Sequence, residues 1–234
     1  MSREAILKAM ADLADPGRAA VSRRFFKTGP GEYGEGDVFI GLAVPKVRAL
    51  SRAHRHMAMR DVLRLLRSKI HEERQLALFI WVLQFPKADE KTKKLIFDQY
   101  LAHTTFINNW DLVDASAEHI VGAFLKDRPK KVLLDLARSS SLWERRIAML
   151  ATFGYIKTGA LEWPLKMAAR LLHDDEDLIH KAVGWMLREI GNRDLKAEEA
   201  FLKAHYKAMP RTMLRYAIEK FPAALRKKYL EGKV

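Results

Sequence analysis

The chain contains no cysteine. Disulfide bonds, thiolate metal sites and a cysteine nucleophile are therefore excluded, and a reducing compartment is permitted. Glycine and proline are few, at 12 and 8 of 234 residues, which excludes a collagen-like or low-complexity chain. The longest apolar run, Leu76 to Leu83, is too short to span a membrane, and the N-terminus has no apolar signal core. We therefore expect a soluble cytoplasmic protein.

Several motifs of enzymes are also absent. There is no G-x-S-x-G elbow, no Walker motif, and no H-E-x-x-H or other metal spacing among the eight histidines. One formal G-x-G-x-x-G spans Gly29 to Gly34, but no strand precedes it and Pro30 removes a backbone N–H from any phosphate cradle. We interpret it as a flexible loop that could still touch a ligand. The acidic run from His173 to Asp177 is interpreted as helix capping, so we expect neither a metal nor a cofactor.

Charge of one sign is in excess. Lysine and arginine total 42 against 29 aspartate and glutamate residues, which gives a formal net charge of +13. A polyanionic partner, namely DNA, RNA or an anionic membrane, is favoured over a surface that is merely solubilising. The 49% hydrophobic and 30% charged residues are ordinary for a globular protein.

Hydrophobic residues recur at helical spacing along nearly the whole chain, as in Ile6, Met10 and Leu13. Strand-like alternation is scarce outside residues 37–41. Short proline-marked connections and a repeat of about 35 residues are typical of an all-α solenoid of HEAT-like helical repeats. We predict one domain over residues 1–234, in which residues 1–43 form N-terminal helices and a Gly-rich loop and residues 44–234 form a curved array.

Five segments align on one polar anchor residue in the second helix of successive pairs, at intervals of 40, 32, 35 and 34 residues. The anchors are Arg74, Asp114, Arg146, Lys181 and Arg215. Four are cationic and one is acidic. The register predicts a concave basic groove with a single acid, while helices at 130–137 and 161–172 form the convex side. Arg211 would extend the basic strip, and Arg145 either contacts DNA or pairs with an acid elsewhere in the array.

Two aromatic residues lie four positions from an anchor, and therefore on the same helix face. Trp110 precedes Asp114, and Trp185 follows Lys181. An indole beside a carboxylate suits a cationic or electron-poor group, because the carboxylate offers negative charge and the ring offers its negative π face. The alternative is that Trp110 belongs to the core and Asp114 caps a helix. Gly184, inside a helix, indicates close packing or approach of a ligand.

Three of these stretches resemble the AlkD-like DNA glycosylases, the DNA alkylation repair family of HEAT-like repeats. The stretches are Trp110-Asp-Leu-Val-Asp114, Trp143-Glu-Arg-Arg146 and Lys181-Ala-Val-Gly-Trp185-Met-Leu-Arg-Glu189. The likeness runs from about Val44 to about Pro222. It implies excision of cationic alkylpurines, such as N7-alkylguanine and N3-alkyladenine, from double-stranded DNA in base excision repair, without a base-flipping pocket.

The resemblance also implies roles for single residues. Asp114 matches the catalytic carboxylate, which stabilises an oxocarbenium-like sugar and places the water. Trp110 and Trp185 match aromatic walls around the deoxyribose, and Arg146 matches an arginine that grips the adjacent backbone. One acid is enough, because an alkylated purine that is already cationic leaves without being protonated.

The chain departs from the family in its Gly-rich stretch, Gly29 to Gly36, which is longer than in the characterised glycosylases. Phe25 and Phe26 stand near the place of a tyrosine expected to contact DNA. The alternatives are a non-catalytic HEAT-repeat protein that binds damaged or branched DNA, and a protein-binding HEAT scaffold. We expect a monomer without an obligate protein partner or membrane contact, associated with the nucleoid if the source is a prokaryote.

Overall fold

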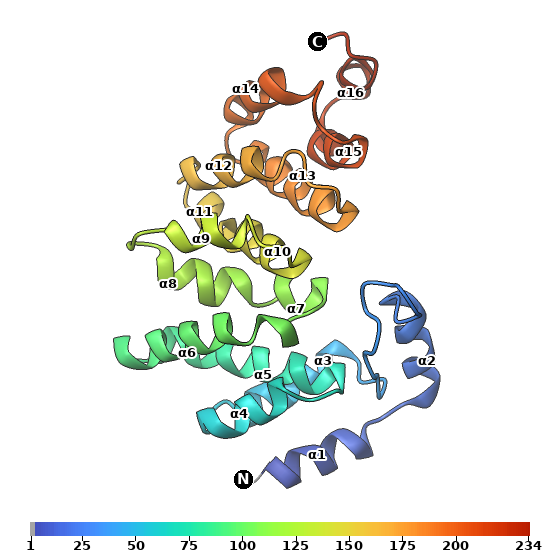
Figure 1. The fold of residues 1–234 in the computed structure, drawn as a ribbon, viewed down its shortest axis with the longest axis vertical. Helices are drawn as coiled ribbons and strands as arrows, with labels where there is room; N and C mark the ends of the chain where they lie inside the picture. Colours follow the sequence, from blue (N-terminus) through green and yellow to red (C-terminus); the bar gives the residue numbers. More distant parts are fainter. Residues whose placement is uncertain (1–2) are drawn as a thin grey trace. The chain divides into compact units, whose positions relative to one another are not determined.

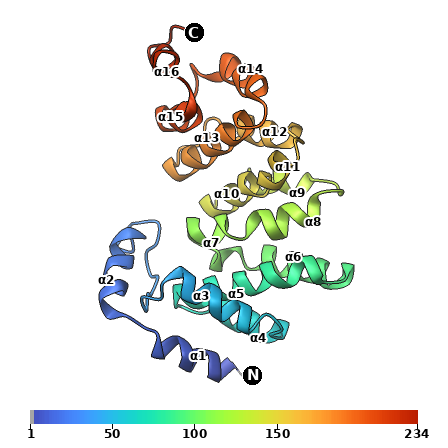
Figure 2. The same cartoon turned by 180° about the vertical axis from the view of Figure 1, so that it is seen from behind.

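The computed structural model describes residues 3–234, and the predicted all-α fold is confirmed for them. In this range the bridge between Val38 and Ile70 is the single pairing of extended backbone, and it is isolated. No helix of the described range is long and apolar enough to cross a membrane. The helices follow one another in pairs joined by short connections (Figures 1 and 2).

The chain divides into two compact units, Met1–Ser116 and Ala117–Val234. The single continuous array stays a prediction. The first unit contains α1 (Arg3–Asp12), α2 (Pro16–Phe25), α3 (Val44–Ala53), α4 (Met59–Leu66), α5 (His71–Gln84), α6 (Glu90–Ala102) and α7 (Trp110–Asp114). The second contains α8 (Ala123–Leu125), α9 (Lys131–Leu136), α10 (Leu142–Leu150), α11 (Phe153–Lys157), α12 (Glu162–Arg170), α13 (Asp177–Gly191), α14 (Leu195–His205), α15 (Arg211–Ala217) and α16 (Ala223–Leu230). Single-turn 3₁₀ segments lie at Phe85–Lys87, Thr104–Phe106 and Ile218–Lys220, and a π turn at Glu118–Gly122.

Helix α5 is the centre of the first unit. Its residues from His71 to Trp81 are all buried, and α3, α4 and α7 pack against it. This burial is expected for the part from Leu76 to Trp81, which is apolar on every side. The burial extends to charged residues of its first turn, which therefore need partners inside the protein. Glu72 accepts hydrogen bonds from the backbone N–H groups of Ile40, Gly41 and Leu42, at 2.8 to 3.2 Å. These bonds fasten the segment after the Gly-rich loop to the start of α5.

Helix α13 has the same central place in the second unit. It packs against α10 and α15 in one layer and against α12 and α14 in the other, and both views show this arrangement (Figures 1 and 2). The helices predicted at 130–137 and 161–172 correspond to α9 and α12, which pair with α10 and α13. A Cβ atom on Gly184 would lie 2.4 Å from the carbonyl oxygen of Met213, so this glycine permits close packing of α13 on α15.

Candidate functional site

A cavity of about 500 Å³ opens in the first unit beside α7. One group of lining residues is aromatic and consists of Phe25, Phe26, Phe39, Phe79 and Trp110. The other group is polar or charged and consists of Arg18, Ser22, Arg48, His71, Glu72, Gln75, Asp111 and Asp114. Aromatic walls with a few convergent polar groups are typical of a ligand site.

Trp110 and Asp114 are the first and last residues of α7, and both line this cavity. The helix begins at Trp110 because the Asn109 side chain accepts the Trp110 backbone N–H at 2.9 Å, which satisfies one of the unpaired donors of the first turn. Both Trp110 and Asp114 are partly exposed. The shared face predicted from their four-residue spacing is therefore observed, and Trp110 is not a core residue.

The indole of Trp110 belongs to a stack of rings. It lies on Phe26 with 5.3 Å between ring centroids, and Phe26 lies on Phe39 with 5.1 Å between centroids. Phe25 meets Trp110 edge-on at 5.8 Å and is itself 62% exposed. Phe26 and Phe39 were missed as wall residues, since neither belongs to a periodic helical segment of the repeat array.

A buried network of charges supports this wall. The two ring nitrogens of His71 each contact a carboxylate: Nδ1 lies 3.0 Å from Asp37 Oδ2, and Nε2 lies 2.9 Å from Asp111 Oδ2. Arg74 donates from Nη2 to Asp37 Oδ1 at 2.7 Å, and Gln75 donates to Asp111 Oδ2 at 2.8 Å. The network thus connects the end of the Gly-rich loop, the first turn of α5 and the first turn of α7.

The network changes how readily its members ionise. Burial alone would lower the pKa of His71, but its hydrogen bonds to Asp111 and Asp37 outweigh burial and raise it. Burial would raise the pKa of Asp37, but the contacts with His71 and Arg74 outweigh it and lower the pKa. The contacts within the network therefore favour the charged form of both residues.

Arg74 does not lie where the register placed it. The side chain is buried, at 3% exposure, and it also donates to the backbone oxygens of Ser68 and Lys69. Its partner Asp37 comes from the non-helical loop, which the alignment of helices left out. We therefore correct the prediction that Arg74 contacts DNA: its guanidinium stabilises the interior of the first unit.

The second unit contains the remaining predicted site residues, and two arginines of α10 are held inside it. Arg146 is 5% exposed and donates to the backbone oxygen of Leu178. Arg145 forms a two-point ion pair with Asp174, at 2.6 and 3.3 Å. Of the two alternatives for Arg145, pairing with an acid is the one observed. Trp143 of the same helix packs inward at 9% exposure.

The predicted cations Lys181, Arg211 and Arg215 of the second unit lie on α13 and α15. Lys181 pairs with Asp177 one turn earlier at 2.7 Å and keeps 39% of its side chain exposed. Arg211 donates to the backbone oxygen of Leu230 at 2.6 Å, and both Arg211 and Arg215 are exposed. Trp185 of α13 is partly exposed and meets Phe153 edge-on at 5.5 Å.

Trp110 and Asp114 belong to the first unit, whereas Arg146 and Trp185 belong to the second. The grouping of all four around one deoxyribose stays a prediction. Among residues 3–234 there is no group of three or more His, Cys, Asp or Glu side chains placed to hold a metal ion. His180 is partly buried and bonds to the backbone oxygen of Asp174.

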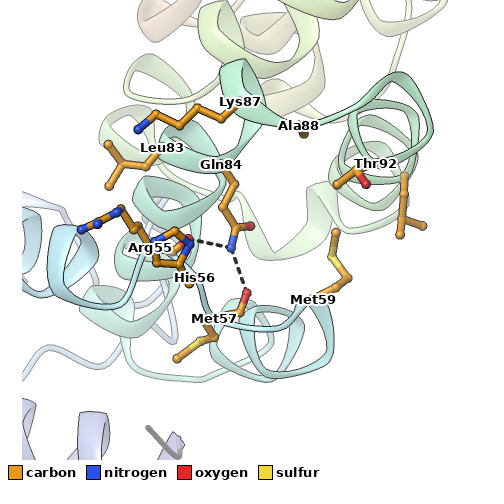
Figure 3. Close-up of a pocket in the computed structure, with 10 residues that line it drawn as sticks. Arg55, His56, Met57, Met59, Leu83, Gln84, Lys87, Ala88 and Thr92 are labelled. Carbon is orange, nitrogen blue, oxygen red and sulfur yellow. Dashed lines mark hydrogen bonds between the residues drawn. The ribbon is translucent and has the colours of Figure 1, made fainter.

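A second cavity of the first unit, of about 570 Å³, lies between α4, α5 and α6 (Figure 3). Gln84 points into the turn before α4 and donates to the backbone oxygens of Arg55 and Met57, at 2.9 and 2.8 Å. The lining combines methionines and leucines with Arg55, His56 and Lys87. It holds no carboxylate, so the chemistry expected of Asp114 has no counterpart here.

Comparison with known proteins identifies the family. A family model described as DNA alkylation repair enzyme matches residues 6–221. A solved structure described as a predicted DNA alkylation repair enzyme from Enterococcus faecalis superposes with a TM-score of 0.69 at 16% identity, covering 90% of this chain and 97% of that one. The structure of smu.31 from Streptococcus mutans UA159 gives a TM-score of 0.52 at 17% identity, covering 92% and 95%. No curated protein matches.

The chain therefore belongs to the DNA alkylation repair enzyme family, over nearly its whole length. The two structural relatives share the helical fold. The family membership gives the protein a role in the repair of alkylated DNA, and makes DNA its expected partner.

Proposed function

We propose that the protein is a DNA glycosylase that excises cationic alkylated purines, such as N7-alkylguanine and N3-alkyladenine, from double-stranded DNA. The observation that carries the proposal is the position of Asp114. Its carboxylate shares the wall of a 500 Å³ cavity with the indole of Trp110 and the rings stacked on it. This surrounding suits a group on which positive charge develops.

The chemistry needs one carboxylate. When the N-glycosidic bond of an alkylated purine breaks, its electron pair goes to the purine and cancels the positive charge of the base. The sugar is left with oxocarbenium character at C1′. The Asp114 carboxylate stabilises this charge, since fixed charges in a partly desolvated site act more strongly than in water. Water then adds to C1′ and loses a proton, which leaves an abasic site and the free base.

The aromatic rings have a second function in this scheme. The face of an indole attracts a cation, by about 0.5–2 kcal/mol depending on desolvation. Trp110 therefore contributes to the same charge stabilisation as Asp114 and also excludes water from one side of the sugar. We propose the equivalent role for Trp185. We also propose a contact of Arg146 with the adjacent backbone, which requires this 5% exposed side chain to become accessible when DNA binds.

We propose that the exposed cations Lys181, Arg211 and Arg215 bind phosphates of the duplex. Each neutralised phosphate releases counterions, so the affinity should fall steeply as salt rises. Arg215→Gln should reduce the salt slope by about one. Lys131→Gln on α9, whose side chain is 83% exposed and pairs with Asp135, is the matched control. Fluorescence anisotropy with a labelled duplex at several salt concentrations measures both.

Release of base separates the proposal from the non-catalytic alternative. The protein is incubated with a duplex containing one 7-methylguanine, and free base is quantified by chromatography against the spontaneous loss without protein. Release well above that background supports a glycosylase. Salt-dependent binding without release would support a protein that binds damaged or branched DNA, and a salt-insensitive affinity would point to the protein-binding scaffold.

A further inference from the structure

Helix α7 is too short to hold its own orientation. It has five residues, Trp110–Asp114, whereas isolated helices of fewer than about 12 residues are marginal in water. The direction of the Trp110 indole and the Asp114 carboxylate must therefore be set by what tethers α7 to its neighbours. The Asn109 cap fixes the start of the helix, but it lies on the same segment and cannot tie α7 to the rest of the unit.

Two of the tethers to other elements run through His71, in addition to the hydrogen bonds that Gln75 donates to Asp111 and Asn108 donates to Asp37. Through its ring nitrogen Nε2, His71 contacts Asp111, in the first turn of α7. Through its ring face it contacts Phe26, at 5.1 Å between centroids, and Phe26 is the ring on which Trp110 stacks. His71 itself is 1% exposed and is packed on its ring by Phe39, at 4.5 Å.

The contacts of His71 require both ring nitrogens to donate. Asp37 lies 3.0 Å from Nδ1 and Asp111 lies 2.9 Å from Nε2. A neutral imidazole has a single N–H, so one of its nitrogens would face a carboxylate lone pair to lone pair. The imidazolium donates to both carboxylates and also presents positive charge to the faces of Phe26 and Phe39.

We infer that His71 is a positioning residue of this enzyme: as an imidazolium held between Asp37 and Asp111, it fixes the Trp110–Asp114 turn, and base release depends on its charge. The inference rests on the proposed glycosylase function. It also gives the Gly-rich loop a role, because Asp37 is the residue at which that loop ends.

The charges around His71 show what deprotonation would do. Asp37 shares its charge with Arg74, from Nη2 at 2.7 Å, so it keeps a cationic partner. Asp111 has His71 as its cationic partner and the neutral Gln75 as its other one. The other charged groups at the same cavity are Arg18 of α2, Arg48 of α3, Glu72 of α5 and Asp114 of α7. Glu72 is occupied by three backbone N–H groups. Loss of the His71 proton therefore weakens the contact with Asp111 of α7 more than the contact with Asp37.

The sign of the pH dependence follows. The pKa of His71 is raised in the folded protein, so the tie is fully formed below the ordinary histidine pKa of about 6.5 and is lost as pH rises through the raised value. Base release and the order of the Trp110 ring should both decline in that alkaline window.

The experiment combines nuclear magnetic resonance with kinetics on the full chain. The ¹⁵N shifts of His71 give its protonation state, and the indole N–H signal of Trp110 reports the tethered turn. Both should titrate with one midpoint. Single-turnover release of 7-methylguanine should lose rate with that same midpoint, with KM changed by less than about twofold.

Asp111→Asn is the informative variant, because it keeps the shape of the side chain and removes one of the two carboxylates. The His71 midpoint, the Trp110 midpoint and the alkaline limit of base release should all move to lower pH together. Asp98→Asn, an exposed carboxylate of α6 paired with Lys94, is the control and should move none of them.

Three results would overturn the inference: a His71 that is neutral near pH 7, a Trp110 signal that ignores its titration, or base release in Asp111→Asn with an unmoved alkaline limit. The failure of the proposed function has a different signature. In that case no base is released at any pH, while the resonance titrations of His71 and Trp110 still decide whether the positioning network exists.

Discussion

The indole of Trp110 stacks on the ring of Phe26, with 5.3 Å between the ring centroids and 23° between the ring planes. Trp110 begins α7, and Phe26 directly follows α2, so the wall of the cavity is built from two distant segments of the chain. The stack places an extended aromatic face beside Asp114. The wall therefore contains residues both from α7 and from the N-terminal segment that follows α2.

Removal of the indole should slow base release. Trp110→Ala deletes a cation–π contribution of about 0.5–2 kcal/mol, which corresponds to a rate loss of about 2- to 30-fold. Phe26→Leu keeps an apolar side chain but removes the stack, and should cause a smaller loss. Single-turnover assays measure both. Phe25→Leu, at an exposed ring that lines the same cavity but meets Trp110 only edge-on, should cause a smaller loss than Trp110→Ala. An undiminished rate in Trp110→Ala would contradict the role of the wall.

Removal of one partner of the buried ion pair between Arg74 and Asp37 should destabilise the protein strongly. Both side chains are 4% exposed, so Arg74→Leu leaves a buried carboxylate with one cation fewer and should cost about 3–5 kcal/mol. Urea unfolding measures the loss. Lys94→Leu, at the exposed pair with Asp98, should cost less than about 1 kcal/mol. Equal effects of the two substitutions would show that Arg74 is not committed to the interior.

Arg74 also shows how far the sequence predicts this site. The spacing correctly places Arg74 in the first turn of a helix, but not on an exposed basic face, because its side chain is 3% exposed. The register could not show that Asp37 lies opposite Arg74, since Asp37 lies outside the helices on which the register is built. The all-α fold, the shared face of Trp110 and Asp114, and the close packing at Gly184, which was one of two alternatives for that glycine, all follow from local spacing and are observed.

Part of the network around His71 could be predicted from the spacing of its residues in the sequence. His71 lies three residues before Arg74 and four before Gln75, while Asp111 lies three before Asp114, so each set shares a helix face. What spacing cannot give is the contact between the two sets, which depends on how α5 and α7 pack. Buried polar partners from different elements therefore appear only in the structure.

Glu198 should make the stability of the protein depend on pH. It is 2% exposed, one of its oxygens has no hydrogen-bond partner among the described residues, and burial raises its pKa to about 8. The unfolded chain loses this proton near the ordinary value of 4.5, whereas the folded protein keeps it to about pH 8. Stability should therefore fall as pH rises between these values.

The substitution Glu198→Gln removes the titrating carboxyl group. It should therefore abolish the part of the fall in stability with rising pH that comes from Glu198. Thermal unfolding at pH 5 and pH 8 tests it: the variant should gain Tm relative to the wild type as pH rises. The exposed Glu162→Gln on α12 is the control, with a difference from wild type that is the same at both pH values. A Glu198→Gln difference that does not grow with pH would contradict the burial of a protonated carboxyl.

Gly184→Ala should destabilise the protein although alanine is the better helix former. The new Cβ would lie 2.4 Å from the backbone oxygen of Met213 and 2.5 Å from Cβ of Tyr216, so α13 and α15 must separate, at about 1–3 kcal/mol. Gly154→Ala is matched, since its Cβ would meet Glu118 at an ordinary 3.5 Å. That variant should be neutral or gain up to about 1 kcal/mol. Thermal unfolding compares them, and a Gly184→Ala protein as stable as Gly154→Ala would refute the close contact.

The most direct test of the proposed function is the single-turnover release of 7-methylguanine from duplex DNA by wild type and by Asp114→Asn. The substitution keeps the shape of the side chain and removes the charge that stabilises the sugar. We therefore expect the rate of base release to fall by about 10²–10³-fold, as it does in other enzymes when one group that stabilises transition-state charge is removed. Asp135→Asn, a half-exposed carboxylate paired with Lys131, should release base at the wild-type rate. Release by Asp114→Asn at the wild-type rate would contradict the account.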